Sequence, residues 1–173
     1  MVERLSSAAE LPMHFQELAD LHQLRHRSLG HPDSFASPQF HAFLRQAAEG
    51  FYARGELYMG RLLIGGQPAA AALGIVSGSV LYMYQCGMAP ALAAHRPGWL
   101  LNIATIRHAI EQGLDKVDFL RGDEPYKCQL GGEPTELLET CLVGPRLSSR
   151  LFHDAWAATR TVKSWVKAAL ATR

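Results

Sequence analysis

The sequence lacks any apolar run of the roughly 20 residues that a membrane-spanning helix requires. Residues 1–12 also lack the continuous apolar core of a signal peptide. Cysteine is scarce, and its three positions show neither the paired spacing of a disulfide framework nor that of a zinc site: Cys86, Cys128 and Cys141. We therefore expect reduced thiols, no bound metal and a cytoplasmic location.

A strong imbalance of charge is absent as well. The 17 Lys and Arg residues nearly balance 16 Asp and Glu residues, so nothing in the net charge of +1 demands nucleic acid as a partner. Of the eight histidines, only His22 and His26 have a four-residue helical spacing, and no Glu lies between them as in zinc proteases. Only the last segment has an excess of positive charge. It contains a single acidic residue, Asp154, and these basic residues: Arg150, Arg160, Lys163, Lys167 and Arg173.

The first half of the chain predicts two helices and three strands. Apolar residues recur at helical spacing over residues 13–27, and again after Ser37, a good N-cap, and Pro38, a good first helical residue. Strands over 57–64, 68–76 and 80–87 are separated by turn signals and predict an antiparallel meander. The small residues at 69–72 indicate close packing of a helix on that strand.

The second half predicts one parallel crossover. A helix over 98–112 between the strand at 80–87 and a strand at 116–120 implies a right-handed β-α-β unit. A further strand over 136–143 and a terminal helix over 147–172 complete the expected elements. The predicted fold class is α/β, with a mixed, mainly antiparallel sheet flanked by helices. We expect one domain over 1–147 and a C-terminal amphipathic helix over 148–173, packed on it or extending from it.

Ionisable side chains and a tyrosine cluster where the strand at 116–120 ends. Because a strand end holds its backbone rigidly while the next loop varies freely, this is a favourable place for a catalytic site. A network that only fastens the loop is the alternative. The candidate residues are Asp118, Arg121, Asp123, Glu124, Tyr126 and Lys127.

The run 118–127, preceded by 82–87 and by Arg96-Pro97-Gly98, resembles the acetyltransferase-like domain of bacterial cellulose and exopolysaccharide biosynthesis proteins. That group belongs to the Gcn5-related N-acetyltransferase (GNAT) superfamily and is similar to the Fem aminoacyl transferases. The resemblance covers roughly Phe15 to Gly132. It implies an acyl-coenzyme A donor, with acetyl-coenzyme A expected, and a small-molecule or glycan-precursor amine as acceptor.

The resemblance also implies where the donor binds. A helix N-terminus offers unpaired amides and partial positive charge, so the start of the helix after Arg96 can seat a pyrophosphate. The superfamily signature is richer in glycine than this segment, and a plain helix-start turn is the alternative. The expected donor-binding residues are Gly87, Met88, Arg96, Pro97, Gly98 and Trp99.

Acyl transfer requires a neutral amine and a proton for the departing thiolate. We assign Glu124 or Asp123 to deprotonation of the amine and Tyr126 to protonation of the thiolate. Lys127 or Arg121 would hold an anionic group of the acceptor, and Asp118 would orient one of these two cations. Removal of Lys127 is expected to weaken binding more than folding.

Two other functions remain open from the sequence. The donor can be an aminoacyl-tRNA, as in Fem transferases, or the chain can be a non-catalytic module that binds a partner in polysaccharide biosynthesis. The amphipathic C-terminal helix is expected to pack on its own domain, with a homodimer contact or a membrane surface as alternatives. Since related proteins often have a second, similar half, the chain can also be a fragment of a longer protein.

Overall fold

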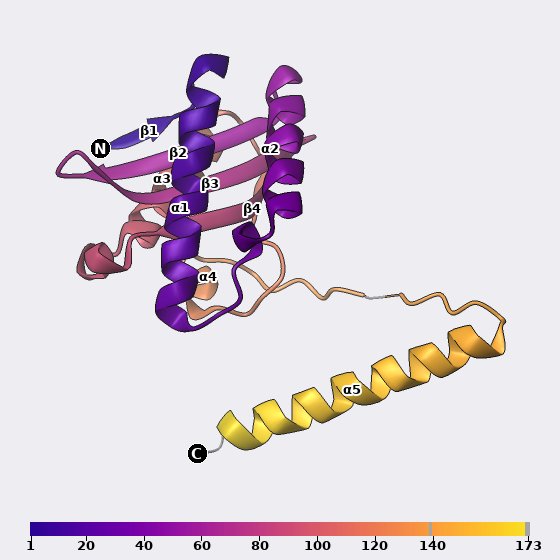
Figure 1. Cartoon of the computed structure of the whole chain (residues 1–173). Coiled ribbons are helices and arrows are strands. Elements are labelled where there is room, and N and C mark those ends of the chain that lie inside the picture. Colours follow the sequence, from indigo (N-terminus) through magenta and orange to yellow (C-terminus); the bar gives the residue numbers. More distant parts are fainter. Residues whose placement is uncertain (139, 172–173) are drawn as a thin grey trace. The chain divides into compact units, whose positions relative to one another are not determined.

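A computed structural model describes residues 1–138 and 140–171, with side chains described within 1–138 and 140–159. The chain divides into two compact units, Met1–Pro134 and Thr135–Arg173. The first unit is a layered α/β domain, with helices on both faces of a five-stranded sheet (Figure 1). The predicted mixed, mainly antiparallel sheet flanked by helices is confirmed.

The sheet has its strands in chain order. Antiparallel pairing joins the first four, and the fifth is parallel to the fourth. The strands are β1 (Val2–Arg4), β2 (Leu57–Ile64), β3 (Gln67–Ser77), β4 (Val80–Met88) and β5 (Lys116–Asp118). The helix between β4 and β5 forms the expected parallel crossover. β1 is an edge strand that the sequence did not reveal.

Helices α1 (Leu11–Leu29) and α2 (Pro38–Ala53) share one hydrophobic core with one face of the sheet. As predicted, Ser37 caps α2, because its hydroxyl accepts a hydrogen bond from the Phe40 N–H. Small side chains on β3 allow this close packing. Ala71 belongs to the core under α1 and α2, whereas Ala70 and Ala72 belong to the core on the opposite face.

Helix α3 (Pro97–Glu111) contributes to the cores of the opposite face. A buried hydrogen bond also ties it to the sheet, because the hydroxyls of Tyr58 on β2 and Thr105 on α3 lie 2.8 Å apart. A 3-10 segment, Pro90–His95, connects β4 to α3. The N-terminus of α3 is thereby fixed beside the end of β4.

The segment after β5 departs from prediction in one respect. The short helix α4 (Pro125–Gln129) begins at a proline as expected, but the predicted strand over 136–143 is wrong. Residues 136–138 and 140–143 are not in a strand, and Glu139 lies outside the described residues. The described residues of this segment pair with no strand of the sheet, and Leu138 and Leu142 are highly exposed, so its apolar residues lack the cross-strand packing that favours a strand.

The second unit contains helix α5 (Leu147–Ala171), which matches the predicted terminal helix except for Thr172, a residue outside the described range. Among the helices of the described residues, none is long and apolar enough to cross a membrane.

Candidate active site

The edge of β4 becomes free where β5 stops. β4 and β5 pair only from Val80 with Lys116 to Tyr82 with Asp118, whereas β4 continues to Met88. A bulge in β4 begins at the same point, because Met83 and Gln85 pair with consecutive β3 residues and leave Tyr84 without a partner. A bulge bends its strand and increases the local twist. The two parallel strands therefore separate, and backbone groups of residues 83–88 are left unpaired by β5.

The N-terminus of α3 follows this free edge after the 3-10 segment Pro90–His95. Arg96 precedes the helix with a positive φ of 50°, which few residues other than glycine adopt readily. Pro97 is buried and lacks an N–H, while the amides of Gly98 and Trp99 belong to the unpaired first turn. A Cβ added to Gly98 would meet only the sulfur of Met88, at 3.8 Å. The protein's own packing therefore leaves open space over this residue.

Asp118 shapes the chain at the end of β5. One of its carboxylate oxygens accepts the Leu120 N–H at 2.8 Å, and the other lies 3.0 Å from the Lys116 ammonium. Burial raises the pKa of Asp118, but these two partners outweigh it and hold the pKa below its ordinary value. Leu120 takes a positive φ of 56°, which ends the strand two residues earlier than expected. Asp118 thus fixes this turn through direct contacts with Lys116 and Leu120, and of the two expected cations the charge of Lys127 also acts on its carboxylate.

Lys127 fastens the loop that follows. Its ammonium lies 3.1 to 3.3 Å from the carbonyl oxygens of Leu120, Arg121 and Gly122, and 2.8 Å from the Glu124 carboxylate. Only 13% of the Lys127 side chain is exposed. The ammonium is therefore surrounded by acceptors from its own loop, as in the alternative interpretation in which charges fasten the loop.

Glu124 folds back over Gly122. A Cβ on Gly122 would lie 2.5 Å from a Glu124 carboxylate oxygen, which could move aside, but the φ of Gly122 is 123°, and this conformation requires glycine. The hydrogen bond from Lys127 is the main cause that lowers the pKa of Glu124. Glu124 is consequently ionised at neutral pH and is a weak base. Arg121 and Asp123 are exposed on the same loop.

Tyr126 extends from α4 toward the free edge of β4. Its ring packs edge-on against Phe119, with 6.0 Å between centroids. Burial, followed by the neighbouring Cys86 and Glu124, raises the pKa of Tyr126 to about 12. Cys86 belongs to the part of β4 that β5 does not cover. The phenol therefore remains protonated over the whole physiological range and lies near the part of β4 that β5 leaves free.

Gly87 and Met88 face opposite sides of β4. A Cβ on Gly87 would lie 2.3 Å from the His22 backbone nitrogen, so glycine is required for α1 to cross this strand. Met88 packs with Leu101 in the core under α3. Gly87 is thus explained by packing, while the described contacts leave the backbone edge of the strand available.

Residues 2–128 match the sequence profile of the family described as "Acetyltransferase (GNAT) domain". The chain belongs to the GNAT acetyltransferase family. No curated protein matched the sequence significantly.

Solved structures share the GNAT fold with this chain. An aminoglycoside acetyltransferase from an uncultured soil metagenomic sample, in complex with sisomicin, is 17% identical, with a TM-score of 0.53 over 85% of this chain and 95% of its own. A predicted acetyltransferase from Clostridium acetobutylicum, solved with acetyl-CoA, is 14% identical, with a TM-score of 0.60 over 82% and 96%. The aminoglycoside acetyltransferase AAC(6')-Iy, in complex with a bisubstrate analogue, is 16% identical, with a TM-score of 0.55 over 82% and 97%.

Several partners in this GNAT site could not be found from the sequence. Lys116, the partner of Asp118, lies two residues before it on β5, so only its side-chain direction was missing, whereas Cys86, the neighbour of Tyr126, comes from the separate strand β4. The hint for Cys86 was the predicted parallel pairing of its strand with β5. The register of that pair, which the sequence does not specify, decides which residue of β4 reaches Tyr126.

Proposed function

We propose that this domain transfers the acetyl group of acetyl-coenzyme A to the amine of a small acceptor, an amino sugar or a glycan precursor. The observation that carries the proposal is the separation of β4 from β5, which leaves a free edge with Tyr126 near Cys86 and the start of α3 near Met88. Structurally similar acetyltransferases were solved with acetyl-CoA and with sisomicin, which supports both the donor and the acceptor class.

The donor would lie along the free edge of β4. An extended pantetheine can accept and donate hydrogen bonds with unpaired strand amides and carbonyls, as an added strand does. The first-turn amides of Gly98 and Trp99, together with the Arg96 guanidinium, would hold the pyrophosphate. The open space over Gly98 allows phosphate oxygens to approach the backbone closely.

Tyr126 would act as the general acid. As the acceptor nitrogen bonds to the thioester carbonyl carbon and the C–S bond breaks, the phenol donates its proton to the departing sulfur, and the proton that the new amide nitrogen loses returns to the phenolate directly or through water. The high pKa of Tyr126 keeps that proton available at every working pH. The acceptor must arrive as a free amine, so its ammonium proton passes first to water or to a carboxylate.

Asp123 and Glu124 would receive the cationic acceptor. Both side chains are exposed on the loop between β5 and α4, and the lowered pKa of Glu124 makes it better suited to attract an ammonium than to remove its proton. Residues 1–145 contain eleven basic and fifteen acidic residues. This excess of acid favours a cationic amine over aminoacyl-tRNA, whose phosphates would require a basic surface.

The proposal is tested by incubating the protein with acetyl-coenzyme A and a panel of amino sugars, and following acceptor mass by mass spectrometry. One acetyl group should be gained by at least one amino sugar, while the corresponding sugars without an amine remain unchanged. Acetylation of no amine, despite measurable donor binding, would contradict the acceptor assignment.

A further inference from the structure

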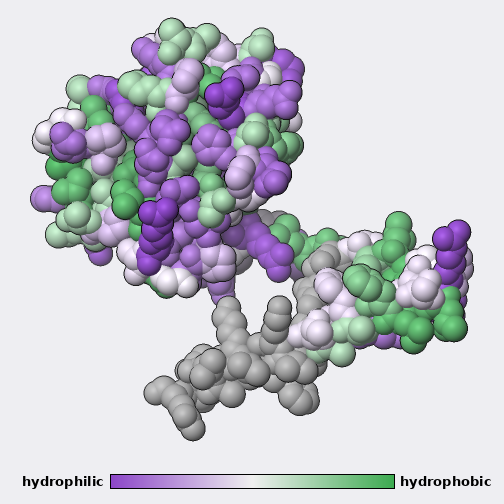
Figure 2. All heavy atoms as spheres, viewed as in Figure 1, coloured by the Kyte–Doolittle hydropathy of each residue, from purple (hydrophilic) through white to green (hydrophobic). Residues whose placement is uncertain are grey.

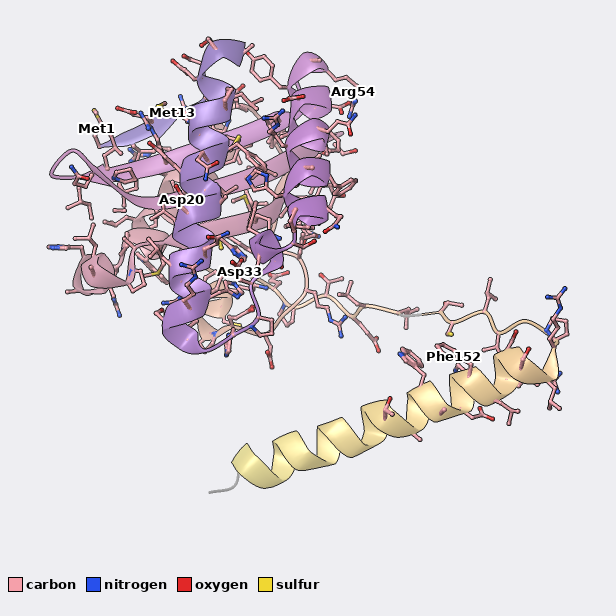
Figure 3. All side chains as sticks on the ribbon, in the orientation of Figure 1. Met1, Met13, Asp20, Asp33, Arg54 and Phe152 are labelled. Carbon is pink, nitrogen blue, oxygen red and sulfur yellow. The ribbon has the colours of Figure 1, made fainter. Side chains whose placement is uncertain are left out.

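The unit formed by residues 135–171 leaves large apolar side chains uncovered by its own structure. The exposed fraction is 93% for Leu142, 76% for Phe152 and 73% for Leu147. Figure 2 shows hydrophobic residues gathered around the start of this helix, and Figure 3 shows Phe152 projecting from its first turns. A unit of this size cannot bury such residues internally, and a contiguous exposed apolar surface marks an interaction site.

The described turns of α5 separate apolar from polar residues. At 3.6 residues per turn, Leu147, Leu151 and Phe152 fall on one side of the helix, whereas Arg150 and His153 fall on another. Between the preceding loop and these turns lies an open hollow of about 540 Å³, lined in part by Leu142, Val143 and Phe152. The apolar side is therefore uneven, with protruding side chains around a depression.

The charge of this segment is opposite to that of the rest of the chain. Residues 146–173 contain six basic residues and one acidic residue, whereas residues 1–145 have an excess of acid. α5 is also too polar to cross a bilayer. A helix with Leu and Phe on an apolar side and with Arg on another is typical of helices that lie in the membrane interface.

We propose that residues 142–171 bind the surface of an anionic membrane, with α5 lying in the plane of the interface. The apolar side chains enter the acyl boundary, where a fluid surface adapts to the hollow, and the basic residues contact lipid phosphates. The 25 residues of α5 span roughly 38 Å in this orientation. The proposal concerns attachment alone and does not rest on the acetyltransferase reaction.

The test is sedimentation of the full chain with phosphatidylcholine vesicles, with and without phosphatidylglycerol. Binding should require the anionic lipid and decrease with salt. The double variant Arg146→Gln, Arg150→Gln should bind more weakly by about fivefold for each charge removed. The double variant Leu151→Ser, Phe152→Ser should lose binding by at least about tenfold, because it removes buried apolar area.

Phe43→Ser is the matched control. Phe43 on α2 is 61% exposed, so this variant removes a comparably exposed ring from the first unit, and vesicle binding should remain unchanged. Two results would overturn the proposal. One is the absence of binding to anionic vesicles at low salt. The other is vesicle binding that is absent while another partner covers α5. A wild-type dimer would indicate that a second copy covers it, and a decreased melting temperature of the Leu151→Ser, Phe152→Ser variant would indicate that the first unit does.

Discussion

At the scale of single residues, the proposed reaction depends most on Tyr126. We expect Tyr126→Phe to decrease kcat by about 100-fold or more, because the variant retains the ring but cannot protonate the thiolate. The affinity for acetyl-coenzyme A should change little. Single-turnover kinetics, together with calorimetric titration of acetyl-coenzyme A, would check this. An unchanged kcat would show that another group supplies the proton.

In Glu124→Gln, we expect weaker acceptor binding, seen as an increase in KM with a smaller effect on kcat.

Substitutions of two glycines near the free edge of β4 should have opposite effects on folding and on acetyl-coenzyme A binding. Gly98→Val should fold normally, because the space over this residue is open, but it should bind acetyl-coenzyme A at least about tenfold more weakly by blocking the phosphates. Gly87→Ala should instead lower the free energy of unfolding by at least about 2 kcal/mol, because its Cβ would overlap the α1 backbone. Thermal unfolding and donor titration of both variants test the contrast. A folded Gly98→Val that binds normally would argue against a phosphate site at α3.

At the scale of elements, Lys127 connects α4 to the loop after β5. Lys127→Met retains the length of the side chain but leaves the carbonyls of Leu120, Arg121 and Gly122 without this donor. We expect a decrease of about 1 to 2 kcal/mol in unfolding free energy. Hydrogen exchange should increase at residues 120–124, and kcat should fall because Tyr126 is no longer held. Weaker acceptor binding with unchanged stability, as the sequence suggested, would contradict this role.

The elements with clear periodicity could be predicted from the sequence, and the elements defined by pairing could not. α2 follows from Ser37, Pro38 and an apolar face, and the meander follows from two glycine-containing turns. β1 has only three residues and is held partly by the Glu3 and Arg61 ion pair across the strands, at 2.6 Å, a contact without a local signal. The segment 136–143 has a strand-like pattern but no partner strand.

The location of the candidate site could be predicted from the sequence, but the contacts among its side chains could not. Gly122 and Pro125 predicted that Tyr126 lies on a short helix after a strand, and the structure confirms this. The partners of Asp118 and Lys127 depend on the backbone carbonyls and amides that the loop presents, and these follow from the positive φ of Leu120. Since few residues other than glycine adopt this conformation readily, residue type alone gave no indication of the turn.

At the scale of the whole molecule, the buried His14 and His22 and the partly buried His108 should make stability depend on pH. Burial is the main cause that lowers the pKa values of His14, His22 and His108 below 6.5. The unfolded chain therefore binds more protons than the folded chain as the pH falls below 6.5, and stability present above that value is progressively lost. The opposing Asp33 contact moderates the effect at His22.

We expect the melting temperature to fall between about pH 7.5 and about pH 5, and to fall less steeply in the double variant His14→Gln, His108→Gln. His95→Gln is the control, since His95 is an exposed residue. Thermal unfolding followed by circular dichroism across this range is sufficient. Parallel curves for the wild type and the double variant would contradict the assignment to these histidines.

The central claim is that the separation of β4 from β5 receives an acyl thioester. Calorimetric titration of the full chain with acetyl-coenzyme A tests it most directly. The account predicts saturable binding with one site per chain, weakened in Arg96→Ala and Gly98→Val and retained in Tyr126→Phe. Failure to bind acetyl-coenzyme A or any other acyl-coenzyme A, by a chain shown to be folded, would contradict it.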